Sequence, residues 1–313
     1  MGRLDDAMRR AAEEGAASDS VSTLDLQQEQ VVEFPSEEPA QAAVEAELEP
    51  GPTLLPEVEV SDRVVSEAVD ATRILADRVD ASLSTKTVVD HAMLPTSREQ
   101  YRRLAASLHQ AQGTKGFKVA MVASAVAGEG KTLTAANLAL TLSESYRRNV
   151  LLIDADLRRP SLHTVFRLEG APGLLDGLAA NGETRLRLHK LSSRLTVLPA
   201  GEPTSDPIGA LTSDRMRHLI AEARDVFDWV IIDTPPVGLL TDAALLASMA
   251  DGILLVVKAD STAYDLVNRA LDLIGRERVI GVVLNRATEL PHRSNYDYSK
   301  YYYGQPALPA ARE

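Results

Sequence analysis

The amino-acid sequence predicts an α/β fold in which a mostly parallel β-sheet carries helices on both faces. Short apolar runs alternate along the chain with stretches in which apolar residues recur at helical spacing. The apolar runs are continuous, whereas a strand with one solvated face would alternate apolar and polar residues. Strands that are buried on both faces and joined through helices are typical of parallel sheets, so both observations favour this fold class.

Acidic residues are concentrated in the N-terminal third of the chain, before the strands and helices begin to alternate. The chain has 313 residues and a net charge of −12, and residues 1–95 contain 21 acidic and 7 basic side chains. Residues 1–60 are rich in Ala, Glu, Gln, Ser and Pro, which predicts a largely disordered acidic arm, because little apolar surface is present to offset the ordering entropy. Residues 61–95 are expected to form a short helix (61–83) and a linker (84–95). The rest of the chain is nearly neutral and does not favour nucleic-acid binding.

The composition excludes several kinds of site. There is no cysteine, so disulfides and thiolate chemistry are excluded, and the six histidines are scattered without the spacing of a metal-ligand pair. No apolar run reaches the roughly 18 residues that span a bilayer, and no signal peptide opens the sequence. We therefore expect a cytoplasmic protein.

The predicted domain, residues 96–290, begins with a helix and continues as alternating strands and helices. Thr96 or Ser97 is the expected N-cap of the first helix, and Tyr101 and Leu108 lie on its apolar face. Strands are predicted at 119–124, 150–154, 195–199, 229–233, 252–258 and 279–285. Helices are predicted between them at about 132–146, 159–167, 173–180, 213–226, 240–248 and 263–275.

A glycine-rich loop joins the first predicted strand to the following helix. Gly128 and Gly130 allow backbone N–H groups to approach phosphate oxygens, and the helix N-terminus adds about half a positive charge. Lys131 is expected to reach the β- and γ-phosphates of a nucleotide, and the Thr132 hydroxyl to bind Mg²⁺. Ala125 stands where the full motif has a glycine. The sequence therefore predicts that a loop of Gly128, Glu129, Gly130, Lys131, Thr132 and Leu133 binds a nucleotide together with Mg²⁺.

Carboxylates end two of the other predicted strands. Asp154 and Asp156 follow the second strand, where an extended chain would point them to the same side, and Asp233 ends the fourth. In a parallel sheet these ends meet at one edge, so the three carboxylates are expected to converge beside the glycine loop. Phosphoryl transfer requires positioning and charge neutralisation, and we assign Asp156 and Asp233 to Mg²⁺ together with Thr132. Asp154 is assigned as the base that accepts the proton of an attacking hydroxyl; the division between Asp154 and Asp156 is a hypothesis.

The last segment, residues 291–313, contains most of the tyrosines. Its prolines, its charges and its lack of aliphatic residues argue against a core strand, so we expect a flexible tail with exposed rings. Five of the eight tyrosines of the chain lie there: Tyr296, Tyr298, Tyr301, Tyr302 and Tyr303.

These motifs together resemble a bacterial tyrosine kinase of the capsule and exopolysaccharide type. The resemblance is carried over residues 96–303 by GEGKT, VLLIDADLRRP, WVIIDTPP, GVVLN and the terminal tyrosine cluster. That family has a P-loop ATPase fold, and its loop lacks the first glycine of the full motif. The resemblance implies a protein-tyrosine autokinase in which neighbouring subunits phosphorylate one another's tail tyrosines and so regulate polysaccharide synthesis and export.

The resemblance also implies roles for individual residues. It adds Arg158 to Lys131, Asp154 and Asp156 in the catalytic set, and it places Asn285 against the adenine ring.

It further implies assembly into a homo-oligomer, in the form of a ring. The family's oligomerisation pattern is Glu-x-x-Arg-x-x-Arg; Glu99 and Arg102 match it, whereas Ala105 occupies the third place. Members without a membrane span are activated by a separate membrane protein that sets polysaccharide chain length. Such a partner would recruit this chain to the inner face of the membrane.

Two other functions share parts of this pattern. A partition or septum-positioning ATPase has the same fold and both aspartate motifs, but carries a second lysine five residues before the catalytic one, where this chain has Val126. Its membrane-targeted members end in a basic amphipathic helix, which this tail is not. The other alternative is an ATP-gated regulator of the export machinery that transfers no phosphate.

Overall fold

The computed structural model describes residues 75–168, 172–179, 186–238 and 242–287. The predicted acidic arm (1–60), the first part of the predicted helix (61–74) and the tyrosine-rich tail (291–313) lie outside the described residues.

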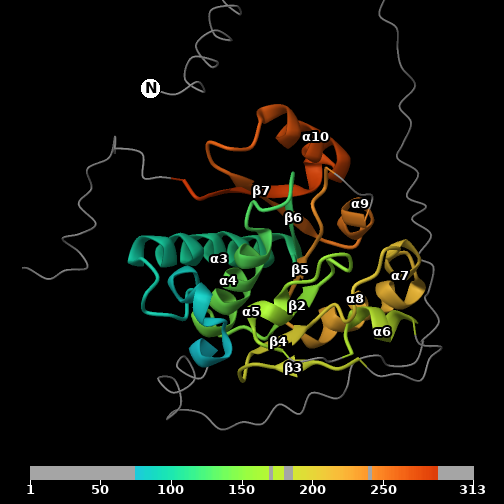
Figure 1. Ribbon diagram of the computed structural model, residues 1–313, viewed down its shortest axis with the longest axis horizontal. Coiled ribbons are helices and arrows are strands. Elements are labelled where there is room, and N and C mark those ends of the chain that lie inside the picture. The colour runs from blue at the N-terminus through green and yellow to red at the C-terminus, as the bar shows by residue number, and fades with distance from the viewer. Residues whose placement is uncertain (1–74, 169–171, 180–185, 239–241, 288–313) are drawn as a thin grey trace, which may run out of the picture. The chain divides into compact units, whose positions relative to one another are not determined.

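A seven-stranded sheet forms the centre of the described chain, in the order β3-β4-β2-β5-β1-β6-β7 (Figure 1). Six strands run parallel, and only the two-residue β3 pairs antiparallel, with β4. The strands are β1 (Val119–Ser124), β2 (Val150–Asp154), β3 (His189–Lys190), β4 (Leu195–Leu198), β5 (Trp229–Asp233), β6 (Gly252–Lys258) and β7 (Val279–Asn285).

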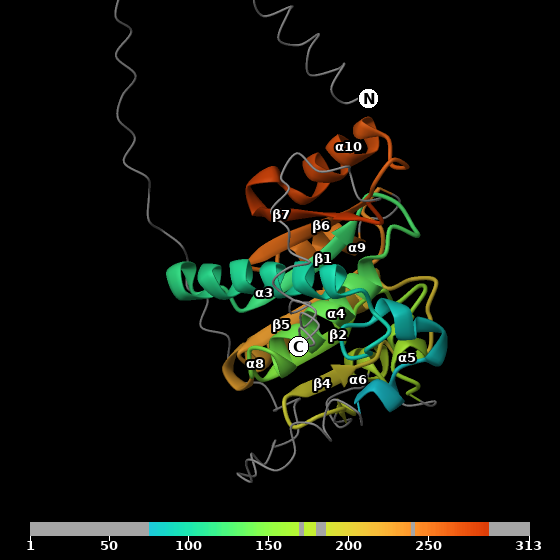
Figure 2. The ribbon, with the colours of Figure 1, turned by 90° about the vertical axis from the view of Figure 1, so that its left-hand side faces the viewer.

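Helices cover both faces of this sheet, as the view in Figure 2 shows. One face carries α3 (Pro95–Lys115), α4 (Lys131–Glu144) and α5 (Leu162–Val165), preceded in the chain by the 3₁₀ helix η1 (Ala81–Lys86). The other face carries α6 (Leu174–Ala179), α7 (Ile208–Leu211), α8 (Asp214–Val226), α9 (Asp242–Ala247) and α10 (Tyr264–Ile274), which the 3₁₀ helix η2 (Arg276–Arg278) follows.

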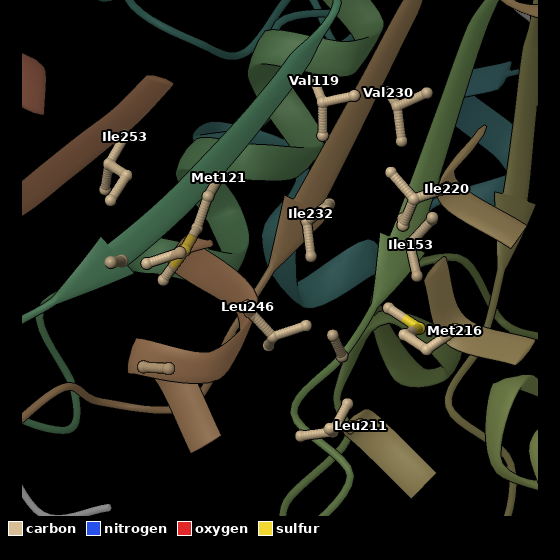
Figure 3. Close-up of a cluster of buried hydrophobic side chains, with 14 of the residues drawn as sticks. Val119, Met121, Ile153, Leu211, Met216, Ile220, Val230, Ile232, Leu246 and Ile253 are labelled. Carbon is tan, nitrogen blue, oxygen red and sulfur yellow. The ribbon is translucent and has the colours of Figure 1, made fainter. Parts of the chain in front are cut away.

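The central strands divide their side chains between two hydrophobic cores. In β1, Val119 and Met121 face the core under α8 and α9, shown in Figure 3, whereas Ala120 and Val122 face the core under α3 and α4. Every residue of β1, β2, β4 and β5 is buried, which confirms the prediction from their continuous apolar composition. Burying one large aliphatic side chain contributes about 1.5–3 kcal/mol, so both faces contribute to holding the strands in register.

That register brings the carboxyl ends of the middle strands together. β5 lies between β2 and β1, and Asp154 at the end of β2 pairs directly with Asp233 at the end of β5. The loop after β1 leaves from the same edge and leads into α4. The fold therefore places the predicted acidic residues beside the predicted phosphate loop.

The segment predicted as a linker, residues 84–95, is instead packed against α4. Val89 and Met93 are buried, and the amide of Asn137 on α4 accepts a hydrogen bond from Val88 N (2.8 Å) and donates one to Lys86 O (2.8 Å). Two apolar side chains and a buried amide thus join this segment to the domain, whose packed part begins before residue 96.

The predicted cap of the first helix is also wrong. Helix α3 begins at Pro95, with Leu94 at the N-cap position and no side-chain cap. Proline is favoured in the first helical turn because its missing N–H has no intrahelical acceptor there.

Short elements account for the other differences. The predicted helix at 159–167 is reduced to α5, which begins only at Leu162, after Pro160, where Asp154 accepts from the amides of Ser161 and Leu162. The strand β3 and the helix α7 have two and four residues, too few to produce a period that the sequence reveals.

Replacing Asn137 by alanine should destabilise the domain. The substitution leaves the amide of Val88 and the carbonyl of Lys86 without their partner, and each part-buried group costs about 1–3 kcal/mol when it is unpaired. We expect the free energy of unfolding, measured in urea, to fall by about 2–4 kcal/mol. As a control, Asn268→Ala on α10, where the amide bonds only the exposed Arg276, should change it by less than about 0.5 kcal/mol. Equal effects of the two substitutions would contradict the role assigned to Asn137.

Candidate functional site

The loop between β1 and α4 has a backbone that only glycine tolerates at two positions. Gly128 and Gly130 adopt φ values of +82° and +95°, in the left-handed region that disfavours residues with a Cβ atom. At Gly130 there is also no room, because a Cβ atom would lie 2.1 Å from the Asn285 Nδ2 atom. The predicted glycine positions are thus required by conformation at both sites and by close approach at the second.

The side chains of Glu129, in the loop, and of Asn285, at the end of β7, fix the conformation of this loop. The Glu129 carboxylate is buried and accepts hydrogen bonds from Val126 N (2.8 Å), from Lys258 N (3.1 Å) and from the Thr262 hydroxyl. Asn285 Nδ2 donates to the Glu129 carbonyl (2.7 Å). The ends of β6 and β7 therefore stabilise the loop conformation.

This arrangement gives Glu129 and Asn285 a structural task that the sequence did not reveal. The Glu129 side chain is turned away from the concave side of the loop, toward the end of β6, so only its backbone is available to a nucleotide. Both polar atoms of the Asn285 amide are engaged, Nδ2 with Glu129 and Oδ1 with the amide of Arg286. The adenine contact expected of Asn285 stays a prediction.

Lys131 and Thr132 occupy the first turn of α4, beside Leu133. The Lys131 ammonium lies 3.0 Å from Asp156 Oδ2 and 3.8 Å from Asp233 Oδ1. Burial by itself lowers the pKa of Lys131, but the charges of Asp233, Asp156 and Asp154 outweigh it, and the pKa is raised. The lysine is therefore held as a cation at the positive end of a helix, where an anion is favoured.

Asp233 is the most isolated of the three carboxylates. It is fully buried, and neither of its oxygens receives a well-formed hydrogen bond from the described residues. Its pKa is raised to about 7, mainly by burial and also by the Asp154 charge, against the opposing effects of the Lys131 ammonium and the Thr132 hydroxyl. A buried carboxylate without donors is a group that a bound cation would stabilise.

Asp154 has different hydrogen-bond partners from Asp156. Asp154 Oδ2 accepts from the amides of Ser161 and Leu162 (both 2.9 Å), and Oδ1 accepts from the amide of Asp156 (3.2 Å). Asp156 lies beyond the end of β2, so strand geometry no longer relates the two side chains. Burial raises the pKa of Asp154 to about 6, although the Leu162 and Ser161 amides lower it.

Arg158 forms its hydrogen bonds with residues outside this cluster. Its Nε donates to Asp242 Oδ2 (2.7 Å), and its Nη1 donates to the Ser205 carbonyl. The hydrogen bond to Asp242, which is almost fully buried, raises the pKa of Arg158. The arginine thus ties the segment after β2 to the start of α9.

Two further residues at the site carried no sequence signal. The Ser161 hydroxyl donates to Thr132 Oγ1 (3.2 Å), and Asp242 is the partner that orients Arg158. Both lie in segments without a recognisable motif, and their partners are 29 and 84 residues away in the chain.

The residues predicted for assembly lie on α3. Glu99 Oε2 is 3.6 Å from Arg102 Nη1, and Glu99 Oε1 is 4.0 Å from Arg103 Nε; all three side chains are substantially exposed. The five predicted phosphoacceptor tyrosines lie outside the described residues.

The donor set of the site is compatible with a hydrated divalent cation. No three His, Cys, Asp or Glu side chains within the described ranges converge to hold a metal by themselves. Mg²⁺ needs only one or two carboxylates when a hydroxyl, waters and phosphate oxygens complete its shell. Asp233 and the Thr132 hydroxyl interact with each other and could supply such ligands, and the Lys131 ammonium lies between Asp233 and Asp156.

Across the described part of the chain, no helix combines the length and apolarity needed to cross a membrane.

Comparison with known proteins gives a family match and close relatives. The ParA family model, described as NUBPL iron-transfer P-loop NTPase, matches residues 117–305. The matched range includes the glycine loop between β1 and α4.

The relatives are more specific. The chain is 35% identical over 203 residues to the tyrosine-protein kinase YwqD of Bacillus subtilis, and the alignment covers 64% of this chain and 85% of that protein. It is 33% identical over 253 residues to the succinoglycan biosynthesis transport protein ExoP of Rhizobium meliloti, covering 75% of this chain and 31% of that protein. The structure is similar to the kinase domain of the Escherichia coli tyrosine kinase ETK, with a TM-score of 0.55 and 30% identity over 63% of this chain and 79% of that one.

The raised pKa of Asp233 predicts a dependence of stability on pH in the metal-free protein. An unfolded aspartate ionises near 3.8, whereas Asp233 ionises near 7 in the folded state, so the folded protein binds the extra proton between these values. The contribution of Asp233 to stability is therefore lost as the pH rises from about 4 to 7. Asp233→Asn cannot ionise, and relative to wild type it should gain about 1–4 kcal/mol in free energy of unfolding between pH 4 and pH 8.

The measurement is urea unfolding in the presence of a chelator at several pH values. Asp265→Asn, at an exposed position on α10, serves as the matched control and should follow the wild type throughout. A constant difference between Asp233→Asn and wild type across this range would show that Asp233 ionises normally.

Proposed function

This chain belongs to the bacterial tyrosine kinases among the ParA-type P-loop NTPases, and we propose that it transfers the γ-phosphate of ATP to tyrosines at the C-terminal end of neighbouring copies. The observation that carries the proposal is the Lys131 ammonium between Asp156 and Asp233, at the N-terminus of α4. Positioning and neutralisation of phosphate charge account for most of the catalysis of phosphoryl transfer.

The proposed nucleotide is ATP with Mg²⁺. The backbone amides of residues 128–133 and the Lys131 ammonium would bind the phosphates, as the left-handed glycines and the helix N-terminus favour. Thr132, Asp156 and Asp233 are the proposed neighbours of the metal. When bound, Mg²⁺ supplies neutralisation of charge on the β- and γ-phosphate oxygens.

Asp154 is the proposed base. The phenolic oxygen of the acceptor bonds to the γ-phosphorus of the substrate while the bond from that phosphorus to the ADP oxygen breaks, and the phenolic proton passes to the Asp154 carboxylate. A pKa of about 6 leaves this carboxylate ionised at neutral pH yet close to the value at which it accepts a proton. The three amides that it binds hold its orientation. Arg158, bound to Asp242 and Ser205, is proposed to position the segment that carries Asp156.

The proposed acceptors are Tyr296, Tyr298, Tyr301, Tyr302 and Tyr303. Each phosphate adds about −1.5 to −2 charges, so several on one short tail repel one another. We propose that this repulsion releases subunits from a homo-oligomer in which Glu99 and Arg102 on α3 contact the neighbour.

The proposed process is the synthesis and export of an extracellular polysaccharide. The relative ExoP is named for succinoglycan biosynthesis and transport, and this chain matches 31% of its length. We propose that a membrane protein that sets polysaccharide chain length activates this chain and recruits it to the inner face of the membrane.

Transfer between copies can be tested by mixing two variants. A Lys131→Met chain with an intact tail should gain no phosphotyrosine alone, because losing the phosphate-binding ammonium lowers the rate by about 10²-fold or more. It should gain phosphotyrosine when mixed with an active chain whose five tail tyrosines are changed to phenylalanine, in Mg²⁺ and ATP. Mass spectrometry of the tail locates the phosphates, and a Lys131→Met chain that also has the five phenylalanines is the control. ATP hydrolysis without phosphotyrosine in any mixture would leave a nucleotide-dependent switch instead of a kinase.

The roles of Asp154 and Asp156 can be separated by kinetics. Asp154→Asn should lower kcat by about 10²–10⁴-fold with little change in the Mg²⁺ concentration for half-maximal rate, because a base is lost. Asp156→Asn should raise that Mg²⁺ concentration by about tenfold, because a metal neighbour is lost. Phosphotyrosine formation during Mg²⁺ titrations gives both values, with the exposed Asp265→Asn as the control. Equal shifts in Mg²⁺ dependence for the two variants would refute this division.

A further inference from the structure

Ser161 lies between the segment that follows β2 and the phosphate loop. Its backbone amide donates to Asp154 Oδ2 (2.9 Å), and its hydroxyl donates to Thr132 Oγ1 (3.2 Å). Asp154 is the proposed base and Thr132 is a proposed neighbour of Mg²⁺, so this one residue contacts both. Because Thr132 is 29 residues away in the chain, the contact arises from the tertiary structure and not from a local turn.

The Ser161 hydroxyl is not used as its place in the chain would suggest. Ser161 is the N-cap residue of α5, where a serine hydroxyl ordinarily accepts from an amide of the first turn. Within the part of the chain that the structure describes, this hydroxyl caps no amide of α5. The Ser161 carbonyl accepts from the amides of Thr164 and Val165 instead (both 3.1 Å). The contact with Thr132 is therefore not a by-product of capping.

The Thr132 hydroxyl has several partners at once. It accepts from the Ser161 hydroxyl (3.2 Å) and from the Lys131 ammonium (3.4 Å). It also interacts with the Asp233 carboxylate and lowers the pKa of that group. A hydroxyl has one proton to donate and two lone pairs. With the proton directed at Asp233, Ser161 and Lys131 occupy both lone pairs, so a cation can bind Thr132 only after one of these donors leaves.

The Lys131 ammonium is the donor that we expect to leave. Its contact with Thr132 is the longer of the two, and a charged donor binds an anionic oxygen about twice as strongly as a neutral one. A phosphate at the N-terminus of α4 would therefore attract the ammonium away from the hydroxyl. Ser161 is neutral and is held through its backbone by Asp154, so it keeps its contact with Thr132.

The contact also opposes a rotation of the Thr132 side chain. A threonine in a helix divides between two rotamers, one of which bonds back to a carbonyl of the preceding turn. Thr134, on the same helix, uses this bond, since its hydroxyl donates to the Gly130 carbonyl (2.9 Å). The same rotamer at Thr132 would take its hydroxyl away from Asp233, and the bond from Ser161 disfavours it.

We propose that Ser161 is a positioning residue of the metal site, whose hydroxyl holds Thr132 in the orientation that presents one lone pair to Mg²⁺. Its amide ties the same group to Asp154. The inference rests on the proposed function and deepens it, because it adds a residue that acts through Thr132 and not by contact with the substrate. Donors that orient a metal ligand typically change metal affinity by about 10–100-fold.

The test measures how strongly Mg²⁺ tightens nucleotide binding. The probe is ADP with a fluorescent label on the ribose, and its Kd on the full chain is measured in a chelator and then across a Mg²⁺ titration. Ser161→Ala should leave the Kd in chelator within about twofold of wild type, because the loop amides and Lys131 are unchanged. It should raise the Mg²⁺ concentration for half-maximal tightening by about tenfold.

Two further variants show whether the hydroxyl is responsible. Ser161→Thr keeps the hydroxyl and should restore the wild-type Mg²⁺ dependence within about threefold. Ser107→Ala on α3, where the exposed hydroxyl bonds only the Arg103 carbonyl, is the matched control and should change neither value. Failure of Ser161→Thr to restore the Mg²⁺ dependence would overturn the inference.

A double substitution shows whether Ser161 acts through Thr132. Thr132→Val removes the hydroxyl and should by itself weaken the effect of Mg²⁺. Adding Ser161→Ala to this variant should shift the Mg²⁺ dependence by less than about twofold, because the interaction is already lost. A further shift as large as that in the wild-type background would overturn the inference.

Stability separates positioning from a merely structural role. Ser161→Ala should leave the Tm unchanged because the hydroxyl caps no described amide of α5, whereas a lost N-cap lowers stability. A lower Tm with wild-type Mg²⁺ dependence, or tighter Mg²⁺ binding in Ser161→Ala, would overturn the inference and leave the proposed kinase untouched. The expected shift, in a chain that never forms phosphotyrosine, would instead retain the role of Ser161 and reject the kinase.

Discussion

The buried contact of the Lys131 ammonium with Asp156 and Asp233 is the interaction on which the rest of the site depends. Three carboxylates gather at one edge of the sheet, and two of them are completely buried. Removing such charges from water costs several kcal/mol per ion, and mutual repulsion adds to the cost. One lysine cation compensates only part of it, which is why Asp233 retains a raised pKa. A site in this state is stabilised further by a cation and a polyanion, the two components of a metal-bound nucleotide.

Two sets of contacts from different parts of the fold hold the groups around this charge cluster. The glycine loop is held by Glu129 and Asn285, which connect it to the ends of β6 and β7. The segment after β2 is held by the backbone amides on Asp154 and by the Arg158–Asp242 pair. Because these contacts are all made within the chain, they hold the groups around the charge cluster in place, as catalysis by charge stabilisation requires.

The sheet order places the glycine loop at the centre of the site. The loop follows β1; β5 and β2, which end in Asp233 and Asp154, lie on one side of β1, and β6 and β7 lie on the other. The carboxylates and the contacts from the ends of β6 and β7 that hold the loop therefore reach it from opposite sides.

The sequence by itself determined the features that arise from local patterns. The limits of β1, β2, β5 and β6 were predicted because a strand buried on both faces must be continuously apolar. The limits of β7 were predicted from the same kind of apolar run, although this edge strand leaves Val282 and Leu284 exposed. The glycine loop was predicted because glycine readily adopts its backbone angles. The convergence of the three aspartates followed from the rule that parallel strands end at one edge. Tertiary structure alone decided how those side chains are used: Asp154 binds amides that follow a turn, Arg158 pairs with a residue 84 positions away, and Glu129 and Asn285 brace the loop. Tertiary structure also decided that residues 84–94 pack against α4, where Asn137 binds the backbone of Lys86 and Val88. Such contacts join residues far apart in the chain, and no local period or motif encodes which distant donor a buried polar group will meet.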